Sequence, residues 1–276
     1  MDFNFLFWLF LIGILIATFQ DLKRREVDDW LNLFLIFSSF TYLFFVSFYL
    51  KDPSIFFQGT FLLLFLLFIM NVFYYGRVFA GGDAKLLLSM TVLFIGVSFY
   101  ESLINVGIFV LFLFISGSVY GIFYSSVLYI RNYDKVNKKL KKNFWTEENK
   151  FIFILGLIFM FSGAYFHFIL LITGILIFIF PILLSLSRAL EEGCMVRFVK
   201  GSELKEGDWL VDEIRIGKKI VRPSFEGLSK KETSLMKNLK LVKIKEGIPF
   251  VPAFLIAYIL YIFREAVFRF VLYKLS

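Results

Sequence analysis

The sequence has one cysteine, Cys194, and one histidine, His167, in 276 residues. A structural zinc site needs about four Cys or His ligands, and a disulfide framework needs paired cysteines. Charged residues are also scarce, at 19%, against roughly a quarter in a typical soluble domain. These shortages exclude a disulfide scaffold, a Cys/His zinc domain and an ordinary cytosolic globule. Nothing in the sequence calls for a cofactor.

Apolar residues, by contrast, are abundant: 59% of the chain is hydrophobic and forty residues are Phe. They form long runs, and a helix needs about 20 apolar residues to cross the ~30 Å hydrocarbon core of a bilayer. We therefore predict an all-α, polytopic membrane helix bundle of about eight transmembrane helices. The candidate spans are residues 3–20, 30–50, 54–75, 84–100, 103–130, two spans within 151–187, and 252–272.

The run 151–187 is 37 residues long. As one helix it would measure about 55 Å, which is too long for one upright span, so we predict two spans with a turn near His167. The flanking blocks 131–150 and 188–248 hold seven and fourteen Lys/Arg. Cytoplasmic loops carry an excess of such residues, so both blocks should lie inside, with an even number of crossings between them.

The same rule orients the whole chain. With the N-terminus outside, 26 of the 30 Lys/Arg lie on the cytoplasmic side. The net charge of +8 is therefore better explained by membrane orientation, with the basic block 131–150 against anionic lipid, than by nucleic acid, which we do not expect as a partner.

This topology predicts five regions. They are a five-helix membrane core (1–130), a basic cytoplasmic loop (131–150), a transmembrane hairpin (151–187), a small cytoplasmic domain (188–248) and a C-terminal transmembrane helix (249–276). The small domain is an α+β insertion before the last helix. We expect strands over 196–199 and 209–216 and a helix over 230–242, opened by a capping box from Ser229 to Glu232.

Few polar groups lie inside the predicted spans, mainly Gln58, Asn71, Asn105 and His167. The notable carboxylates stand at cytoplasmic helix ends instead: Asp21 closes the first span and Asp83 opens the fourth, after Gly81 and Gly82. Taken singly, Asp21 reads as an interfacial acid and Asp83 as a helix N-cap. Together, on one face, they can form an aspartic dyad that shares one proton and activates water to attack a peptide carbonyl.

Two blocks carry a family resemblance. One is Asp21-x-Lys23-x-Arg25-x-Val27 followed by Asp29-Trp30-Leu31, and the other is Gly81-Gly82-Asp83-Ala84-Lys85. Weaker matches are 247–252 and the turn 206–208. The chain resembles the archaeal type IV prepilin peptidases, including the preflagellin (pre-archaellin) peptidases, which are membrane aspartic proteases of the GxGD type. It departs at Ala80, where the strict motif has Gly. The cysteine tetrad of bacterial relatives is absent, so N-methylation of the product is not expected.

The resemblance implies that Asp21 and Asp83 are catalytic. The substrate would be a pilin or archaellin precursor with a short basic leader before a hydrophobic helix, cut at the cytoplasmic membrane face. The other motif residues would support the substrate or the fold: Gly81, Gly82, Lys85, Lys23, Arg25, Glu26, Asp28 and Asp29.

The three acids among these supporting residues are Glu26, Asp28 and Asp29. They either attract the basic leader or are solvated loop charges. Lys85 either stabilises the charge of Asp83, holds a lipid phosphate, or reaches the interface as a snorkelling side chain. The glycines would let the chain turn tightly and let a substrate strand approach.

Two other functions compete with proteolysis. A cation- or proton-coupled transporter could use the same aspartates, but transporters usually place such groups near the midplane and show internal repeats. A non-catalytic scaffold subunit of a pilus or archaellum motor is the third hypothesis, and the paired motifs argue against it.

Overall fold

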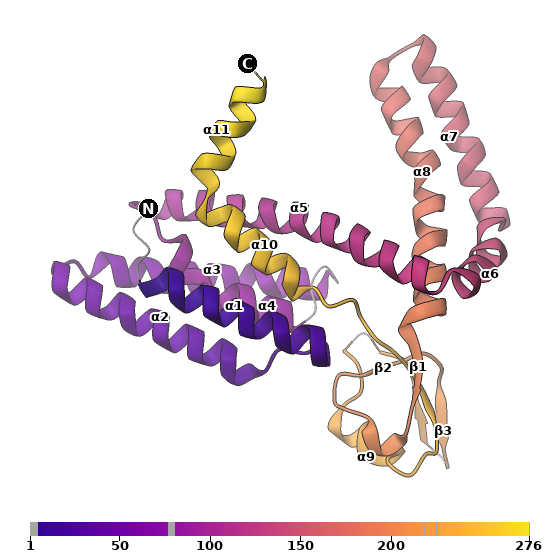
Figure 1. Cartoon of the computed structure of the whole chain (residues 1–276), viewed down its shortest axis with the longest axis horizontal. Helices are drawn as coiled ribbons and strands as arrows, with labels where there is room; N and C mark the ends of the chain where they lie inside the picture. Colours follow the sequence, from indigo (N-terminus) through magenta and orange to yellow (C-terminus); the bar gives the residue numbers. More distant parts are fainter. Residues whose placement is uncertain (1–4, 77–80, 218, 225, 276) are drawn as a thin grey trace. The chain divides into compact units, whose positions relative to one another are not determined.

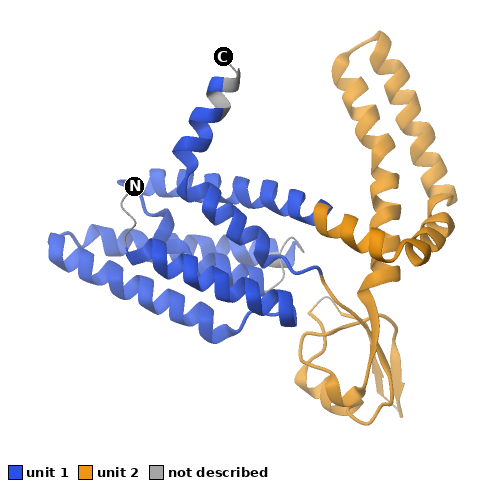
Figure 2. Ribbon diagram, viewed as in Figure 1, with its two compact units in different colours: residues 1–122, 248–276 blue, residues 123–247 orange. Residues whose placement is uncertain are grey.

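The computed structural model describes residues 5–76, 81–217, 219–224 and 226–275. They form two compact units, one of residues 1–122 and 248–276 and the other of residues 123–247 (Figure 2). The long helix α5 (Phe99–Arg131) contributes to both. Each unit is described by itself.

The first unit is a helix bundle (Figure 1). Its elements besides α5 are α1 (Phe5–Arg24), α2 (Asp29–Leu50), α3 (Ser54–Tyr75), α4 (Gly81–Ser89), α10 (Val251–Ile262) and α11 (Arg264–Leu275). The helices α1 to α3 are 20 to 22 residues long and almost wholly apolar, as bilayer-spanning helices must be. Helix α2 is capped by Lys51 in the left-handed conformation (φ 55°). In this cap the backbone N–H groups of Lys51 and Asp52 donate to carbonyl groups in the last turn of the helix.

Side chains from six of these elements meet in one core. Examples that are fully buried are Phe10, Leu35, Leu66, Leu87, Phe109 and Phe254. Many equally large apolar side chains point outward instead, such as Phe37, Phe48 and Phe68. An exposed apolar surface of this extent is expected of helices that face lipid.

The predicted fourth span, 84–100, does not form a spanning helix. Helix α4 has nine residues, about 14 Å, and is followed by a 3₁₀ turn at Thr91–Phe94. The segment nevertheless runs the length of the bundle, because Lys85 contacts Asp29 at one end and the Gly96 carbonyl accepts from Gln58 Nε2 (3.0 Å) at the other. Irregular backbone at this depth is tolerated because it is enclosed by protein and its carbonyls are satisfied, Phe94 O by Asn105 Nδ2 (3.2 Å). Gln58 and Asn105 thus complete a broken helix, a role that the hydropathy of the run does not reveal.

Among the described residues, six helices are long and apolar enough to cross a membrane, and seven if α10 and α11 are taken as one bent span. The predicted single helix over 252–272 is wrong in detail, because α10 ends at Ile262 and α11 leaves at 76°. Arg264 lies at this bend, where its Nη1 donates to the Tyr261 carbonyl (3.3 Å) and its guanidinium stacks on the Tyr261 ring.

The second unit contains α6 (Tyr133–Phe144), α7 (Glu147–Tyr165) and α8 (Phe168–Leu190). Helices α7 and α8 form a hairpin whose turn is at Phe166–His167, where His167 Nδ1 caps α8 by accepting from Ile169 N (3.3 Å). Both helices extend into the flanking charged blocks, which makes them long enough to span. Glycines allow the close packing: a Cβ at Gly163 would lie 2.0 Å from Leu171 N.

The rest of this unit is a small α+β domain. Strand β5 (Val242–Lys245) lies between β1 (Val196–Val199) and β2 (Trp209–Leu210), all antiparallel, and β3 (Ile214–Ile216) pairs with β4 (Lys219–Val221). Helix α9 (Lys230–Met236) opens with the predicted capping box of Ser229 and Glu232. It ends at Met236 rather than 242, because residues 242–245 pair as β5 with β1 and β2. The predicted strand 209–216 is divided into β2 and β3.

Candidate active site

Asp21 lies in the last turn of α1 and is buried, with 6% of its surface exposed. Its Oδ2 accepts a hydrogen bond from the backbone N–H of Val251 (2.9 Å), 230 residues later in the chain. Val251 is the first residue of α10, and the first N–H groups of a helix have no partner within the helix. A carboxylate is favoured at this positive end of the helix dipole. Asp21 therefore joins the first spanning helix to the start of the last one.

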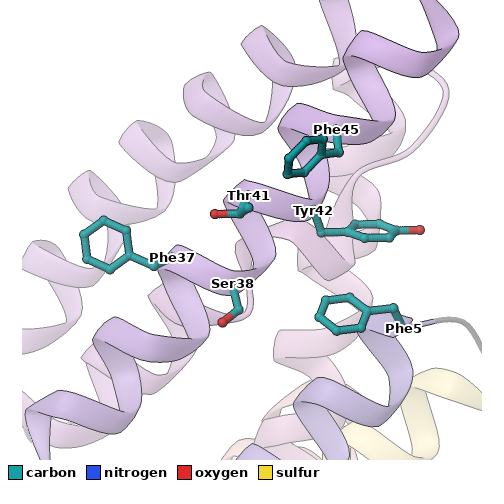
Figure 3. Close-up of a pocket in the computed structure, with 6 residues that line it drawn as sticks. All are labelled: Phe5, Phe37, Ser38, Thr41, Tyr42 and Phe45. Atoms are coloured by element: carbon teal, nitrogen blue, oxygen red, sulfur yellow. The ribbon is translucent and has the colours of Figure 1, made fainter.

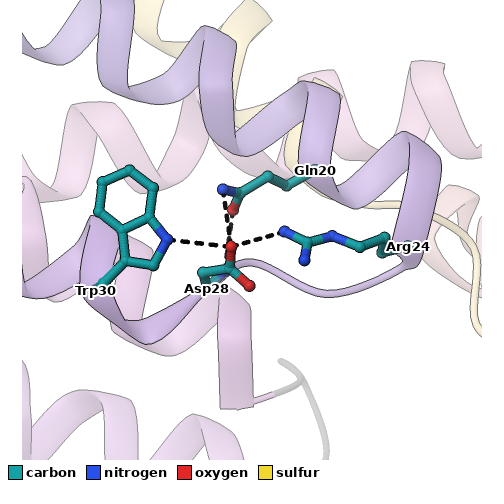
Figure 4. Close-up of polar contacts among 4 residues, drawn as sticks. All are labelled: Gln20, Arg24, Asp28 and Trp30. Atoms are coloured by element: carbon teal, nitrogen blue, oxygen red, sulfur yellow. Dashed lines mark hydrogen bonds and ion pairs between the residues drawn. The ribbon is translucent and has the colours of Figure 1, made fainter.

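The turn between α1 and α2 is closed by a second acid, Asp28 (Figure 4). Its Oδ2 accepts from Gln20 Nε2 (3.1 Å), Arg24 Nη2 (2.7 Å) and Trp30 Nε1 (3.1 Å). Its backbone N–H donates in return to Gln20 Oε1 (3.0 Å). Gln20 is itself buried, so this reciprocal pair holds the residue next to Asp21 against the start of α2. We call the four residues Gln20, Arg24, Asp28 and Trp30 the Asp28 latch.

Asp83 is the third residue of α4 and is half-buried. Two residues later, Lys85 Nζ pairs with Asp29 Oδ1 (2.6 Å), the first residue of α2. Asp29 follows Asp28, which contacts Gln20 beside Asp21. This series of contacts brings the N-terminus of α4 and the C-terminus of α1 to the same end of the bundle. The two predicted catalytic acids therefore share one end of the first unit.

The ammonium group of Lys85 forms an ion pair with Asp29. This contact is different from the three roles considered for Lys85 above. Both side chains are more than half exposed, so the pair contributes little to stability, about 0–1 kcal/mol. It nevertheless aligns two helix ends. Asp28, which precedes Asp29 in the sequence, instead accepts hydrogen bonds from Gln20, Arg24 and Trp30.

The two glycines before Asp83 stand at the start of α4. Gly81 and Gly82 are the first residues of α4, and a Cβ built on Gly82 meets no atom of the described residues within 4 Å. Within the described part of the chain, no side chain therefore requires a glycine at residue 82. Ala80, where the sequence departs from the strict motif, lies outside the described residues.

The basic residues of the first motif end helix α1. Lys23 is exposed, with its ammonium 5.8 Å from the Phe19 ring centre, and Arg25 takes the left-handed conformation (φ 60°) that turns the chain toward α2. Glu26 is exposed in this turn. Lys23 and Arg24 in the last turn complement the negative end of the α1 dipole.

A pocket of about 460 Å³ lies elsewhere, between the start of α1 and the middle of α2 (Figure 3). Its lining is mostly aromatic, with Phe5 stacked on Tyr42 at 5.4 Å. Phe5 is sixteen residues before Asp21, about 24 Å along the helix, so this pocket is remote from the acids. In the described part of the chain, no three His, Cys, Asp or Glu side chains gather into a possible metal site.

Gln20 and the backbone of Val251 were not among the residues predicted for the site. A glutamine at the end of an apolar helix, next to an acid, was a signal available in the sequence. For Val251 the signal was the neighbouring Pro252, because proline is favoured in the first turn of a helix. The backbone N–H groups of that turn have no partner within the helix.

A comparison with known protein families gives one match. Residues 8–129 match the type IV leader peptidase family. The match covers slightly less than half of the 276 residues and includes both Asp21 and Asp83. It supports a type IV prepilin peptidase, as expected from the paired motifs. No curated protein and no solved structure matches the chain.

The match to a leader peptidase family model, together with the long apolar helices of the described residues, supports a multi-pass membrane peptidase. The matched region holds α1 to α4 and most of α5. Helix α10 lies outside it, yet supplies the N–H group that binds Asp21. A segment beyond the matched region thus completes the surroundings of one acid.

Proposed function

We propose that the protein is an aspartic endopeptidase that removes the short basic leader of type IV pilin-like or archaellin precursors. Asp21 and Asp83 would share one proton. The ionised carboxylate would take a proton from water as that water attacks the scissile carbonyl, and the protonated one would donate to the carbonyl oxygen. The observation that carries this proposal is the placement of both acids at one end of the first unit, within the region that matches the leader peptidase family model.

The orientation follows from the charges at the two ends. The end with the acids also carries Lys23, Arg24 and Arg25, whereas the described turn at the other end of α2 has Lys51 alone as a basic residue. The positive-inside rule favours placing the acids at the cytoplasmic face, with the N-terminus outside. A site at helix ends would meet the precursor where its basic leader joins its apolar helix, near the lipid headgroups.

For the leader itself we propose attraction by Glu26 and Asp29, whose carboxylates are exposed beside the acids. A leader lysine would compete with Lys85 for Asp29. Asp28 is the least suited of the three motif acids, because its Oδ2 already accepts from three donors.

The test is a cleavage assay with the purified full-length protein in proteoliposomes. A tagged precursor is mixed with wild type, Asp21→Asn, Asp83→Asn and the control Asp52→Asn, which makes the same change in the exposed turn at the opposite end. Asn keeps the size of Asp but cannot carry the proton, so each site variant should lose at least about 10²-fold in rate.

Wild-type activity in Asp52→Asn, with normal helical content in all variants, would support the dyad. Full activity in Asp21→Asn or Asp83→Asn would refute the aspartic mechanism. A wild-type protein that cuts neither a pilin nor an archaellin precursor would refute the substrate class.

A further inference from the structure

Asn32, in the first turn of α2, is a buried amide to which no described residue hydrogen-bonds. Only 3% of its surface is exposed, and within the described structure neither Oδ1 nor Nδ2 has a hydrogen-bond partner. Buried polar groups are almost always paired, because an unpaired one loses its hydration and gains nothing in return. An amide that lacks both a donor and an acceptor partner therefore calls for an explanation.

The position of Asn32 in helix α2 suggests an explanation for its unpaired amide. Residues three and four apart lie on the same face of a helix, so Asn32 shares a face with Asp28 and Asp29. Asp28 contacts Gln20 of α1, and Asp29 contacts Lys85 of α4. Asn32 thus lies on the side of α2 that faces α1 and α4, the two helices that carry Asp21 and Asp83. Leu35, one turn further along, continues this face against α1: a Cβ at Gly13 would lie 2.6 Å from it.

Two further buried groups without partners flank the same site. Apart from Asn32, the described residues have such atoms only at Thr18 Oγ1 and Ser116 Oγ. Thr18 lies one turn before Asp21. Ser116 precedes Gly117, where an added Cβ would lie 2.8 Å from the Phe250 ring, beside the residue that binds Asp21. All three unsatisfied side chains therefore belong to the end of the bundle that holds the acids, and Asn32 alone carries its donor and its acceptor on separate atoms.

We propose that the Asn32 amide binds the main chain of the substrate beside the scissile bond. Its Nδ2 would donate to a peptide carbonyl, and its Oδ1 would accept from a peptide N–H. A peptide offers these two groups in any sequence, so the contact would position the precursor without reading its side chains. At the same end, no atom of the described residues lies within 4 Å of a Cβ built on Gly82. This assignment rests on the proposed peptidase function.

The test replaces Asn32 by Leu, which has a similar size and no polar atoms. Cleavage of the tagged precursor gives kcat and KM, and thermal unfolding in detergent gives Tm. Asp21→Asn is the inactive reference. The matched control is Ser39→Ala on the same helix, because Ser39 is equally buried but its Oγ donates to the Ile36 carbonyl (3.0 Å).

We expect Asn32→Leu to keep or raise Tm, since it removes an unpaired polar group, while kcat/KM falls about 10- to 100-fold. Asn32→Ser, which retains a donor and an acceptor, should recover part of that loss. Ser39→Ala should cleave like wild type.

Unchanged kcat/KM in Asn32→Leu, with Asp21→Asn inactive, would overturn the substrate contact and leave the proposed function standing. A marked fall in Tm would also overturn it, by showing that the amide supports the fold through a buried water. If wild type cuts no precursor, the peptidase proposal fails, and this assignment fails with it.

Discussion

Replacing Asp28 by Asn separates two roles for this acid: closing the turn between α1 and α2, or attracting the basic leader. The Asp28 latch has three donors on one carboxylate oxygen. Asn keeps the shape but loses the charge, and charge-assisted hydrogen bonds are about twice as strong as neutral ones. The bond to Arg24 is partly exposed and contributes about 0–1 kcal/mol, while those to buried Gln20 and to Trp30 weaken further.

The expected loss is about 2 kcal/mol in the free energy of unfolding. At roughly 2–4 °C per kcal/mol for a chain of this size, Tm should fall by about 4–8 °C. Circular dichroism in detergent micelles measures this change. The precursor's KM should stay near the wild-type value at a temperature where the variant is folded.

The neighbouring substitution Asp29→Asn is the control. It breaks an ion pair with Lys85 in which both side chains are more than half exposed, so Tm should change by no more than about 4 °C. An unchanged Tm in Asp28→Asn, together with a raised KM, would refute the latch and favour leader binding. Equal destabilisation by both substitutions would show that exposure does not determine the strength of these contacts.

Three further outcomes are expected. Gly82→Ala should leave Tm unchanged, because no atom of the described residues lies within 4 Å of the new methyl group, but should slow cleavage if a substrate strand passes there. Gly163→Ala should lower Tm by several degrees through a clash with the α8 backbone, while Gly121→Ala, with open space around it, should not; equal effects would contradict the hairpin packing. The Ser229 N–H and hydroxyl hold the pKa of Glu232 below its ordinary value, so their stabilisation is complete above the pH where a free glutamate ionises and is lost as pH falls through the folded pKa. Ser229→Ala should therefore cost about 1 kcal/mol and flatten the acid limb of Tm against pH, and an unaltered acid limb would contradict this account.

The topology could largely be predicted from the sequence, because hydropathy and charge act locally. An apolar run of 20 residues must hide its backbone in a helix wherever it lies, and basic loops mark one side. The capping box at Ser229 is equally local and was predicted correctly. The fourth span was predicted wrongly for the same reason. Hydropathy shows that the run 84–100 is apolar, but it does not show the contacts of Gln58 and Asn105 with this segment. These contacts allow a short helix and an irregular segment to replace a full spanning helix.

The catalytic candidates were found from two motifs about sixty residues apart, together with the side of the membrane on which each should lie. What surrounds them depends on tertiary structure. Asp21 binds the backbone of Val251 across 230 residues, and Lys85 pairs with Asp29 rather than with the acid beside it in sequence. The missing partners of Asn32 likewise appear only when its neighbours are known. Residue types and spacing determine which groups can do chemistry at a helix end, whereas burial and hydrogen bonding depend on segments that only the fold brings together.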